Sequence, residues 1–235
     1  MEIFKTEKFI DMSHTIASPL FDNAENPWGV LPLISEFIKG LGPYLGSEYV
    51  QTADFVWQHH TAHISPTARI EGPAIIGAGA SMEHCSYIRG GVVVGADCVI
   101  GCGVEVQNSI ICDEAQLLHY CYVADSIIGY KACMGAGSVT SNFKNDRTNI
   151  CVSFSLGKID TKLKQFGAVV GDNSQIGSNT NINPGTIICR NVSIYSMSNV
   201  RGMINENVIY KEGGRLVQRV KIKKELPKGA FEMRA

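Results

Sequence analysis

Large aliphatic residues recur at every sixth position over much of this chain, and this repeat constrains the fold more than any other feature. The first run holds Ile64, Ile70, Ile76, Met82, Ile88, Val94, Ile100 and Val106, and the second holds Val170, Ile176, Ile182, Ile188, Ile194 and Val200. A period of six matches neither the helical period of about 3.6 nor the strand period of about 2. Short strands joined by turns and wound into a prism do match it. The repeat therefore predicts an all-β chain, a parallel β-helix of hexapeptide repeats around a stacked aliphatic core.

The repeat is interrupted between the two runs. Its phase slips near Ile110 and Ile111 and is expected to resume at Tyr122, Ile128, Met134 and Thr140. Residues 141–166 carry no repeat, which predicts a loop excursion from the β-helix. Within it, Val152, Phe154 and Leu156 alternate as in a strand, so we expect a hairpin arm that reaches toward a neighbour.

The two ends of the chain lack the repeat. Short helices interrupted by glycine and proline are expected after Pro27, as a cap over the first coil. Gly213 and Gly214 lie between two strand-like segments and predict a β-hairpin. The expected organisation is an N-terminal helical cap or linker at 1–60, the β-helix at 61–205 with its excursion loop at 141–166, and a C-terminal hairpin and basic tail at 206–235.

Composition argues against several functional classes. The 21 basic and 22 acidic residues leave a formal net charge of -1, whereas proteins that bind nucleic acid or an anionic membrane usually carry a basic excess. The first residues do not resemble an export signal, and no apolar run of about 18 residues could span a bilayer, so a cytoplasmic protein is expected. The eight cysteines are dispersed without a CxxC pair, which predicts reduced thiols packed as small apolar residues.

His119 is the candidate catalytic residue that the pattern itself provides. It lies in the phase break, in the segment LLHYCYVADSIIG, where a side chain need not follow the core pattern. An imidazole titrates near neutrality and can take a proton from an attacking amine. A single histidine can equally be structural, and His84, at a regular turn position, is expected to be a surface residue.

One segment after the phase break, HYCYVADSIIGYKACMGAGSVTSN, resembles the acetyltransferase domain of the bifunctional glucosamine-1-phosphate acetyltransferase and N-acetylglucosamine-1-phosphate uridyltransferase. The resemblance covers about residues 64–200, includes SYIRGGVVVG and VEVQNSII, and is strongest to archaeal-type sugar-phosphate nucleotidyltransferases. It implies a left-handed β-helix, a homotrimer with active sites between subunits, and acetyl-CoA as co-substrate, with no metal.

The resemblance also implies roles for individual residues. His119 is similar to the general base that takes a proton from the sugar amine as it attacks the acetyl-CoA thioester. The other implied site residues are Arg89 for the phosphate, Tyr122 and Asn142 for the sugar, Gln107 also on the substrate side, and Ala136 and Ser178 for the coenzyme. No covalent enzyme intermediate is implied.

Three residues depart from the family pattern and leave the acceptor open. Gln107 replaces a lysine, Cys133 replaces an asparagine that helps to hold the sugar, and Phe143 replaces a polar-tipped aromatic residue. The glycine-rich loop of the nucleotidyltransferase domain has no counterpart in this sequence, so pyrophosphorylase activity is not expected.

The expected function is acyl-CoA-dependent N-acetylation of an amino-sugar phosphate, in nucleotide-sugar or cell-envelope precursor synthesis. A non-catalytic sugar-phosphate or nucleotide-sugar sensor, related to UDP-N-acetylglucosamine pyrophosphorylase, is the alternative that Gln107 and Cys133 favour. The basic C-terminal stretch from Lys211 to Arg234 could meet the phosphates of coenzyme A or form a solvated face.

A zinc hydratase of the γ-carbonic anhydrase type is a second alternative on the same fold. It needs three histidines that converge on the metal between subunits. His59, His60 and His63 are expected to lie before the first coil, away from His119, so the sequence offers no convergent set.

Overall fold

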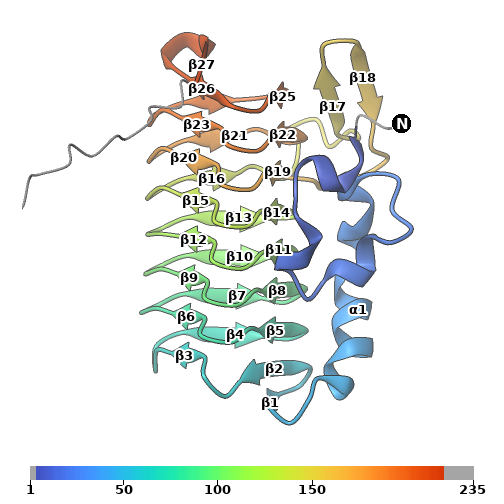
Figure 1. The fold of residues 1–235 in the computed structure, drawn as a ribbon, viewed down its shortest axis with the longest axis vertical. Coiled ribbons are helices and arrows are strands. Elements are labelled where there is room, and N and C mark those ends of the chain that lie inside the picture. The colour runs from blue at the N-terminus through green and yellow to red at the C-terminus, as the bar shows by residue number, and fades with distance from the viewer. Residues whose placement is uncertain (1–3, 220–235) are drawn as a thin grey trace, which may run out of the picture.

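Three parallel sheets wind around one axis in the computed structural model, which describes residues 4–219 (Figure 1). In spatial order the first sheet holds β1 (Tyr49–Ala53), β2 (Val56–His59), β5 (Ala74–Ile76), β8 (Val92–Val94), β11 (Ser109–Ile111), β14 (Ile127–Ile128), β19 (Ala168–Val170), β22 (Thr186–Ile188) and β25 (Met203–Ile204). The second holds β3 (His63–Ile64), β6 (Ser81–Met82), β9 (Val99–Ile100), β12 (Gln116–Leu117), β15 (Cys133–Met134), β20 (Gln175–Ile176), β23 (Ser193–Ile194), β26 (Val208–Tyr210) and β27 (Leu216–Gln218). The third holds β4 (Arg69–Glu71), β7 (Tyr87–Arg89), β10 (Glu105–Gln107), β13 (Tyr122–Ala124), β16 (Val139–Thr140), β21 (Asn181–Ile182) and β24 (Asn199–Val200). Each coil adds one strand to each sheet, as β5, β6 and β7 do, so the predicted parallel β-helix is confirmed.

Aliphatic side chains from all three sheets fill the inside of the β-helix. Both runs of the six-residue repeat point inward, and residues such as Ile88, Ile100 and Ile188 have no exposed surface. Burying one such side chain contributes about 1.5–3 kcal/mol, and the contribution depends on a neighbouring coil being in place. Ile64 and Ile70 are only partly buried and pack against this core from the first coil.

The phase of the repeat differs by one residue from the expectation at Tyr122. The inward residue of β13 is the fully buried Val123, while Tyr122 is partly exposed on the outer face. The steps from Val106 to Ile111 and from Val123 to Ile128 are each five residues long. Because two coils are shortened in this way, a strict six-residue count places Tyr122 inside, and the structure corrects that placement.

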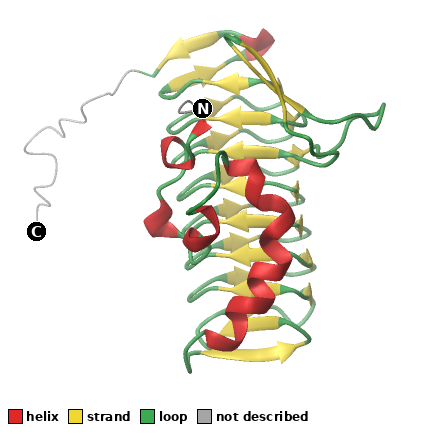
Figure 2. Ribbon diagram, turned by 90° about the vertical axis from the view of Figure 1, so that its right-hand side faces the viewer, coloured by secondary structure: helices red, strands yellow, loops and turns green. Residues whose placement is uncertain are grey.

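A second hydrophobic core lies outside the β-helix, against the outer face of the first sheet. Six outward-pointing residues of this sheet are fully buried, namely Ile75, Val93, Ile110, Ile127, Val169 and Ile187. The N-terminal segment covers them with η2 (Thr6–Lys8), η3 (Met12–His14), η4 (Ser18–Phe21), η5 (Pro27–Leu33), α1 (Ile34–Leu41) and η6 (Gly42–Tyr44) (Figure 2). Phe9, Trp28 and Ile34 are among the side chains that this segment buries.

The N-terminal segment therefore lies along the side of the β-helix and not over its first coil as expected. The reason is the composition of the first sheet, whose strands β8, β19 and β22 contain apolar residues on both faces. The parallel sheet already begins at β2, which pairs with β5. Residues 56–59 thus belong to the first coil, ahead of the expected boundary at 61, and β1 pairs antiparallel with β2 to cover the edge of the sheet.

Asp172 connects the N-terminal segment to the β-helix through hydrogen bonds. Its carboxylate accepts hydrogen bonds from the backbone N–H of Asp11 at 2.8 Å and of Tyr130 at 2.9 Å, and Arg190 Nε lies 3.2 Å away. The Asp172 N–H donates to the carbonyl oxygen of Phe9 at 3.0 Å. Burial raises the pKa of Asp172, although these donors oppose the shift. The carboxylate thus links three distant parts of the sequence.

The excursion forms a hairpin, as expected, from β17 (Cys151–Phe154) and β18 (Gly157–Asp160). The hairpin packs on the N-terminal segment, because the ring of Phe154 meets that of Phe4 at 5.2 Å. Leu156 at its tip is 84% exposed. The hairpin stands beside the last coils in Figure 1.

The predicted C-terminal hairpin joins β26 to β27, with positive φ at Gly213 and Gly214 in its turn. Most of the basic tail, including Arg234, lies outside the described residues. Within residues 4–219 no helix is long and apolar enough to cross a membrane.

The eight cysteines are free thiols in three environments. Cys98, Cys112, Cys121 and Cys189 are buried, Cys102 and Cys133 are partly buried, and Cys85 and Cys151 are exposed. Burial raises the pKa of Cys98 and of Cys189 to about 12, and that of Cys121 to about 11. Packing as small apolar residues is confirmed for the four buried thiols, whereas Cys85 and Cys151 lie at the surface.

We therefore expect thiol labelling to occur in distinct phases. At about pH 8 a reagent in water reaches an exposed thiol directly, whereas a buried thiol with a raised pKa forms little thiolate and reacts slowly. An aromatic disulfide reagent should label Cys85 and Cys151 rapidly in the folded protein and all eight thiols after unfolding in denaturant. Mass spectrometry of the labelled peptides assigns the sites, and fast labelling of Cys98 or Cys189 would contradict the buried positions.

Candidate functional site

One turn of each coil, between the second and third sheets, aligns three of the expected site residues. His119, Ala136 and Ser178 occupy the same turn position in successive coils, and we call this stack the turn column. The N–H of Gly137 donates to the carbonyl oxygen of His119, and the N–H of Asn179 donates to that of Ala136, each at 2.8 Å. The structure thus brings together the predicted base and both predicted coenzyme contacts.

The residue that follows each residue of the turn column sets the conformation of its turn. Tyr120, Gly137 and Asn179 have φ of 53°, 71° and 54°, in the left-handed region. A Cβ on Gly137 would meet Asn179 Oδ1, so any other residue there would have to displace the Asn179 side chain and adopt the left-handed conformation. Because this conformation repeats, the preceding residue of every coil is presented outward at the same corner.

The turn column offers an exposed imidazole and free donors. His119 is exposed, and its side chain makes no hydrogen bond or ion pair within the part of the chain that the structure describes. The backbone N–H groups of His119, Ala136 and Ser178 likewise have no acceptor among residues 4–219. A ligand lying along the column would meet three N–H donors spaced by about 4.8 Å, the distance between neighbouring strands.

Arg89 and Tyr122 lie on the outer face of the third sheet, on either side of Glu105. Arg89 Nη1 donates to Glu105 Oε1 at 2.8 Å, and Glu105 pairs with Tyr122 across β10 and β13. The hydrogen bond and charge of Glu105 raise the pKa of Arg89. Burial, and then Glu105, raise the pKa of the Tyr122 phenol. Tyr122 starts the strand that leaves the turn of His119, so this face adjoins the turn column.

Glu105 was not predicted from the sequence. Its position in the repeat could have indicated it, because residues one coil apart on the same face of a sheet are direct neighbours. The Arg89 side chain remains 41% exposed beside it, so part of the guanidinium fork is free to meet an anion.

Asn142 lies elsewhere, in the corner between the third and first sheets. It is 5% exposed, and its Nδ2 donates to Asp125 Oδ2 at 2.6 Å. Asn108 Nδ2 donates to the other oxygen of Asp125 at 2.7 Å. The two amides hold a buried carboxylate and order this corner, so the placement within one chain gives Asn142 a structural contact and does not support the expected contact with a sugar.

Gln107 and Cys133 lie on different faces. Gln107 is partly exposed at the end of β10 on the third sheet, next to Ala124 of β13. Cys133 pairs with Gln116 and Gln175 on the second sheet, and its pKa is raised by burial. Within one chain the structure does not bring these two residues together.

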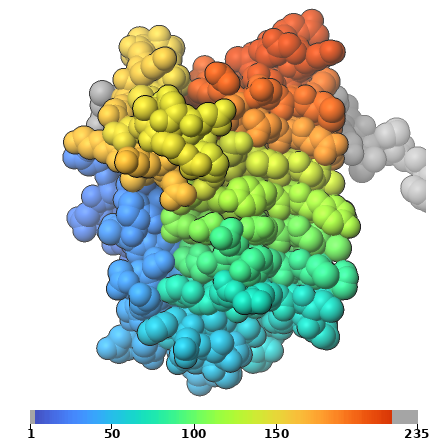
Figure 3. All heavy atoms as spheres, turned by 180° about the vertical axis from the view of Figure 1, so that it is seen from behind, coloured from blue at the N-terminus to red at the C-terminus, as the bar shows by residue number. Residues whose placement is uncertain are grey.

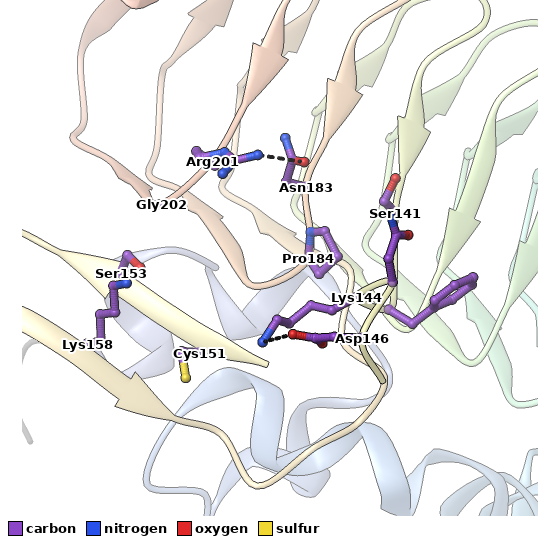
Figure 4. Close-up of a pocket in the computed structure, with 12 residues that line it drawn as sticks. Ser141, Lys144, Asp146, Cys151, Ser153, Lys158, Asn183, Pro184, Arg201 and Gly202 are labelled. Carbon is purple, nitrogen blue, oxygen red and sulfur yellow. Dashed lines mark hydrogen bonds and ion pairs between the residues drawn. The ribbon is translucent and has the colours of Figure 1, made fainter. Parts of the chain in front are cut away.

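A cleft that the sequence did not predict opens where the excursion leaves the third sheet (Figure 4). Ser141, Asn183 and Arg201 line it from the β-helix, and Lys144 and Lys158 line it from the excursion. Its volume is about 670 Å³. Arg201 Nη2 reaches Asn183 Oδ1 at 3.4 Å, and Lys144 Nζ lies 3.6 Å from Asp146.

The excursion protrudes from the surface next to the strands of the third sheet, as the space-filling view shows in yellow (Figure 3). The side of the cleft that belongs to the β-helix lies on the same outer face of the third sheet as Gln107, further along the axis. The three cationic side chains around one carboxylate give the cleft a local positive charge, although the whole chain is nearly neutral.

Comparisons with known proteins find similar chains, some of which are named as acetyltransferases. The family model described as the GMPPB C-terminal domain matches residues 70–153. The bifunctional protein GlmU of Methanococcus vannielii is 28% identical over 82% of this chain and 47% of its own length. The putative uncharacterized acetyltransferase YaiX of Escherichia coli is 30% identical over 54% of this chain and 55% of its own.

The resemblance expected from the motifs is confirmed. A bifunctional sugar-1-phosphate nucleotidylyltransferase/acetyltransferase of Sulfurisphaera tokodaii also matches, with 31% identity over 54% of this chain and 31% of its own. The chain spans about half the length of the first of these relatives. Among solved structures, the polysialic acid O-acetyltransferase OatWY is similar at 15% identity, with a TM-score of 0.40 over 76% of this chain and 92% of that one.

The histidines near the start of the chain do not join His119. His59 ends β2 and His63 starts β3, so both belong to the first coil and do not precede it as expected. In the second sheet β12, which precedes His119, lies three strands beyond β3, or roughly 14 Å along the axis. The three histidines of a hydratase site therefore do not converge within one chain.

Proposed function

We propose that this protein is an acetyl-CoA-dependent N-acetyltransferase that acts on an amino sugar carrying a phosphate. The observation that carries the proposal is the turn column, which places the exposed His119 beside the free N–H groups at Ala136 and Ser178. The relatives named as acetyltransferases support the same chemistry.

In the proposed reaction the sugar amine attacks the thioester carbonyl carbon, the C–N bond forms, and the C–S bond breaks. His119 takes the amine proton as the bond forms and returns it to the departing thiolate of coenzyme A. The free N–H at Ala136 donates to the carbonyl oxygen as negative charge develops on it. The N–H at Ser178 donates to an amide of the pantetheine chain one coil further on.

The acceptor lies in this proposal on the outer face of the third sheet. The exposed part of the Arg89 guanidinium binds the phosphate, because a planar fork can donate two parallel hydrogen bonds to it. Tyr122 contacts the sugar from the neighbouring strand β13. Glu105 orients Arg89 through the 2.8 Å hydrogen bond and keeps it extended along the sheet.

We also propose a homotrimer with active sites between subunits. Cys133, at a position that the resemblance assigns to the sugar site, lies on the second sheet, whereas Arg89 and Tyr122 lie on the third. A second copy that presents its second sheet to this third sheet would bring the two faces together. Sedimentation of the purified protein tests the stoichiometry.

A ligand-binding protein without turnover is the second candidate. Gln107 lacks the positive charge of the lysine expected there, and Glu105 already neutralises part of Arg89. Both features weaken the binding of a phosphate dianion, so they favour a neutral or nucleotide-linked sugar.

A thiol-release assay distinguishes the two candidates. The purified protein is mixed with acetyl-CoA and, in turn, glucosamine-1-phosphate, galactosamine-1-phosphate and their unphosphorylated parents. We expect release of free coenzyme A with at least one phosphorylated amine. No release with any acceptor, together with binding of an unphosphorylated or nucleotide-linked sugar in calorimetry, would support the ligand-binding protein and overturn the transferase.

Replacing Arg89 with alanine should weaken catalysis for phosphorylated acceptors alone. Loss of a charge-assisted hydrogen bond costs about 1.5–3 kcal/mol, or roughly 10- to 100-fold in kcat/KM, expressed mainly as a higher KM. Arg69→Ala on the neighbouring strand β4 is the matched control, because Arg69 pairs with Glu71 on the same face. An equal loss for the unphosphorylated acceptor would show that Arg89 does not bind the phosphate.

A further inference from the structure

We propose that Glu48, His59 and His60 bind a divalent transition-metal ion such as Zn²⁺ at the first coil. Each residue offers one ligand atom, and the three atoms all lie within 4.8 Å of one another. Two imidazoles and a carboxylate are ligands that zinc accepts, with water completing the coordination. Imidazole nitrogen selects transition metals over Mg²⁺ and Ca²⁺, which prefer oxygen.

The two imidazole rings are held in orientations that suit ligands. His59 Nδ1 lies 2.8 Å from Thr61 Oγ1, and its Nε2 faces Glu48 Oε2 at 3.1 Å. His60 Nδ1 lies 3.2 Å from the carbonyl oxygen of Glu48. Because a carbonyl oxygen can only accept, His60 donates its Nδ1 proton to Glu48 and keeps Nε2 unprotonated, as is usual for histidines that bind metals. His59 Nδ1 also accepts a hydrogen bond from the N–H of Thr61 at 3.2 Å, so two contacts with Thr61 fix this ring.

The site is rigid on one side and open on the other. His59 is 8% exposed and packs edge-on against Tyr49 at 5.0 Å, while its ring stacks on that of His60 at 4.5 Å. Glu48 is exposed and can turn toward an ion without disturbing the core. The Nε2 of His59 and the carboxylate of Glu48 already face each other at the place where a cation would bind.

The position of the site gives the ion a structural role. Glu48 precedes β1 and His59 ends β2, and these antiparallel strands form the edge of the first sheet. The N–H of His60 donates to the carbonyl oxygen of Glu48 at 2.9 Å, which closes the same hairpin. A bound ion would link both strands at the end of the β-helix where no earlier coil packs against the core.

Zinc titration by calorimetry tests the site, with untagged protein in which Cys85 and Cys151 are replaced by serine to remove the exposed thiols. We expect one ion per chain, an affinity at least about 10-fold lower in His60→Ala and in Glu48→Gln, and no binding of Mg²⁺. Both variants change exposed side chains, so folding is preserved. His63→Ala, an exposed histidine of the same coil, is the matched control and should bind as the parent does.

Thermal unfolding supplies an independent readout. Zinc should raise the unfolding midpoint of the parent and of His63→Ala and leave His60→Ala unchanged, because a ligand of the native state stabilises by mass action. No zinc binding by the parent, or equal affinity in the parent and both ligand variants, would overturn the proposal. A loss in His63→Ala equal to that in His60→Ala would also overturn the assignment of the ligands.

Discussion

His119→Ala is expected to lower the rate of thiol release by roughly 100- to 10,000-fold, the usual contribution of a general base. The loss should appear in kcat, because the imidazole acts on the amine proton and the coenzyme is held by backbone N–H groups at Ala136 and Ser178. The exposed side chain makes no hydrogen bond within residues 4–219, so the variant should keep its fold and its assembly. Circular dichroism and sedimentation check both.

His84→Ala is the matched control for this experiment. His84 is an exposed histidine at the same turn position two coils earlier, since the N–H of Gly103 donates to its carbonyl oxygen and the N–H of Tyr120 donates to that of Cys102. Its removal should leave turnover unchanged. Unchanged turnover in His119→Ala would refute the proposed mechanism. An equal loss of turnover in both variants would show that any change at this turn position disturbs the protein, and that the imidazole of His119 has no special role.

Trp28→Ala is expected to destabilise the protein by about 3–5 kcal/mol, the range for deleting a large buried aromatic side chain. Trp28 is 3% exposed, and its ring meets those of Phe4 at 5.2 Å and Phe166 at 5.8 Å. It therefore joins the N-terminal segment to the end of the excursion across the first sheet. Urea unfolding of the parent and the variant measures the loss.

Tyr44→Ala is the control for Trp28, because Tyr44 is 85% exposed on the same segment and its loss should change stability little. We also expect limited proteolysis to cut the N-terminal segment of Trp28→Ala first. A destabilisation below about 1 kcal/mol would show that the second core contributes far less than its burial indicates.

The interior of the β-helix could be predicted because each coil repeats one simple requirement. A side chain that points inward must be aliphatic or small in every coil, so the period appears directly in the sequence. The placement of Tyr122 was wrong because two steps of the repeat are five residues long, and a shortened turn leaves no compositional mark.

The second core could have been found from the same sequence. Strands such as Val92–Val94 and Ala168–Val170 are apolar at three successive positions, and the middle residue of each must point away from the interior. Such runs indicate a covered face. What covers it could not be predicted, since the N-terminal segment has no repeat and packs through scattered residues such as Phe9 and Trp28.

The candidate site, too, could be predicted from the sequence only in part. Ala136 and Ser178 were expected from the resemblance, and the structure aligns them with His119. A count of six residues would not align them, because a five-residue step separates His119 from Ala136 and the excursion separates Ala136 from Ser178. The contacts of Glu105 with Arg89 and of Asn142 with Asp125 depend on how side chains turn at a corner or on a face. Such contacts join residues one coil apart, and no local pattern marks them.

The covered first sheet limits how copies of this chain can surround an axis. A three-sided prism with one side closed by its own chain has two sides left, and these are built from different strands with different outward residues. A ring made from such units must join unlike sides, head to tail, and every interface in it is then the same heterologous contact. One substitution of an outward residue at this contact would alter every interface of the ring at once. A single substitution that breaks the contact would therefore prevent assembly of the whole ring.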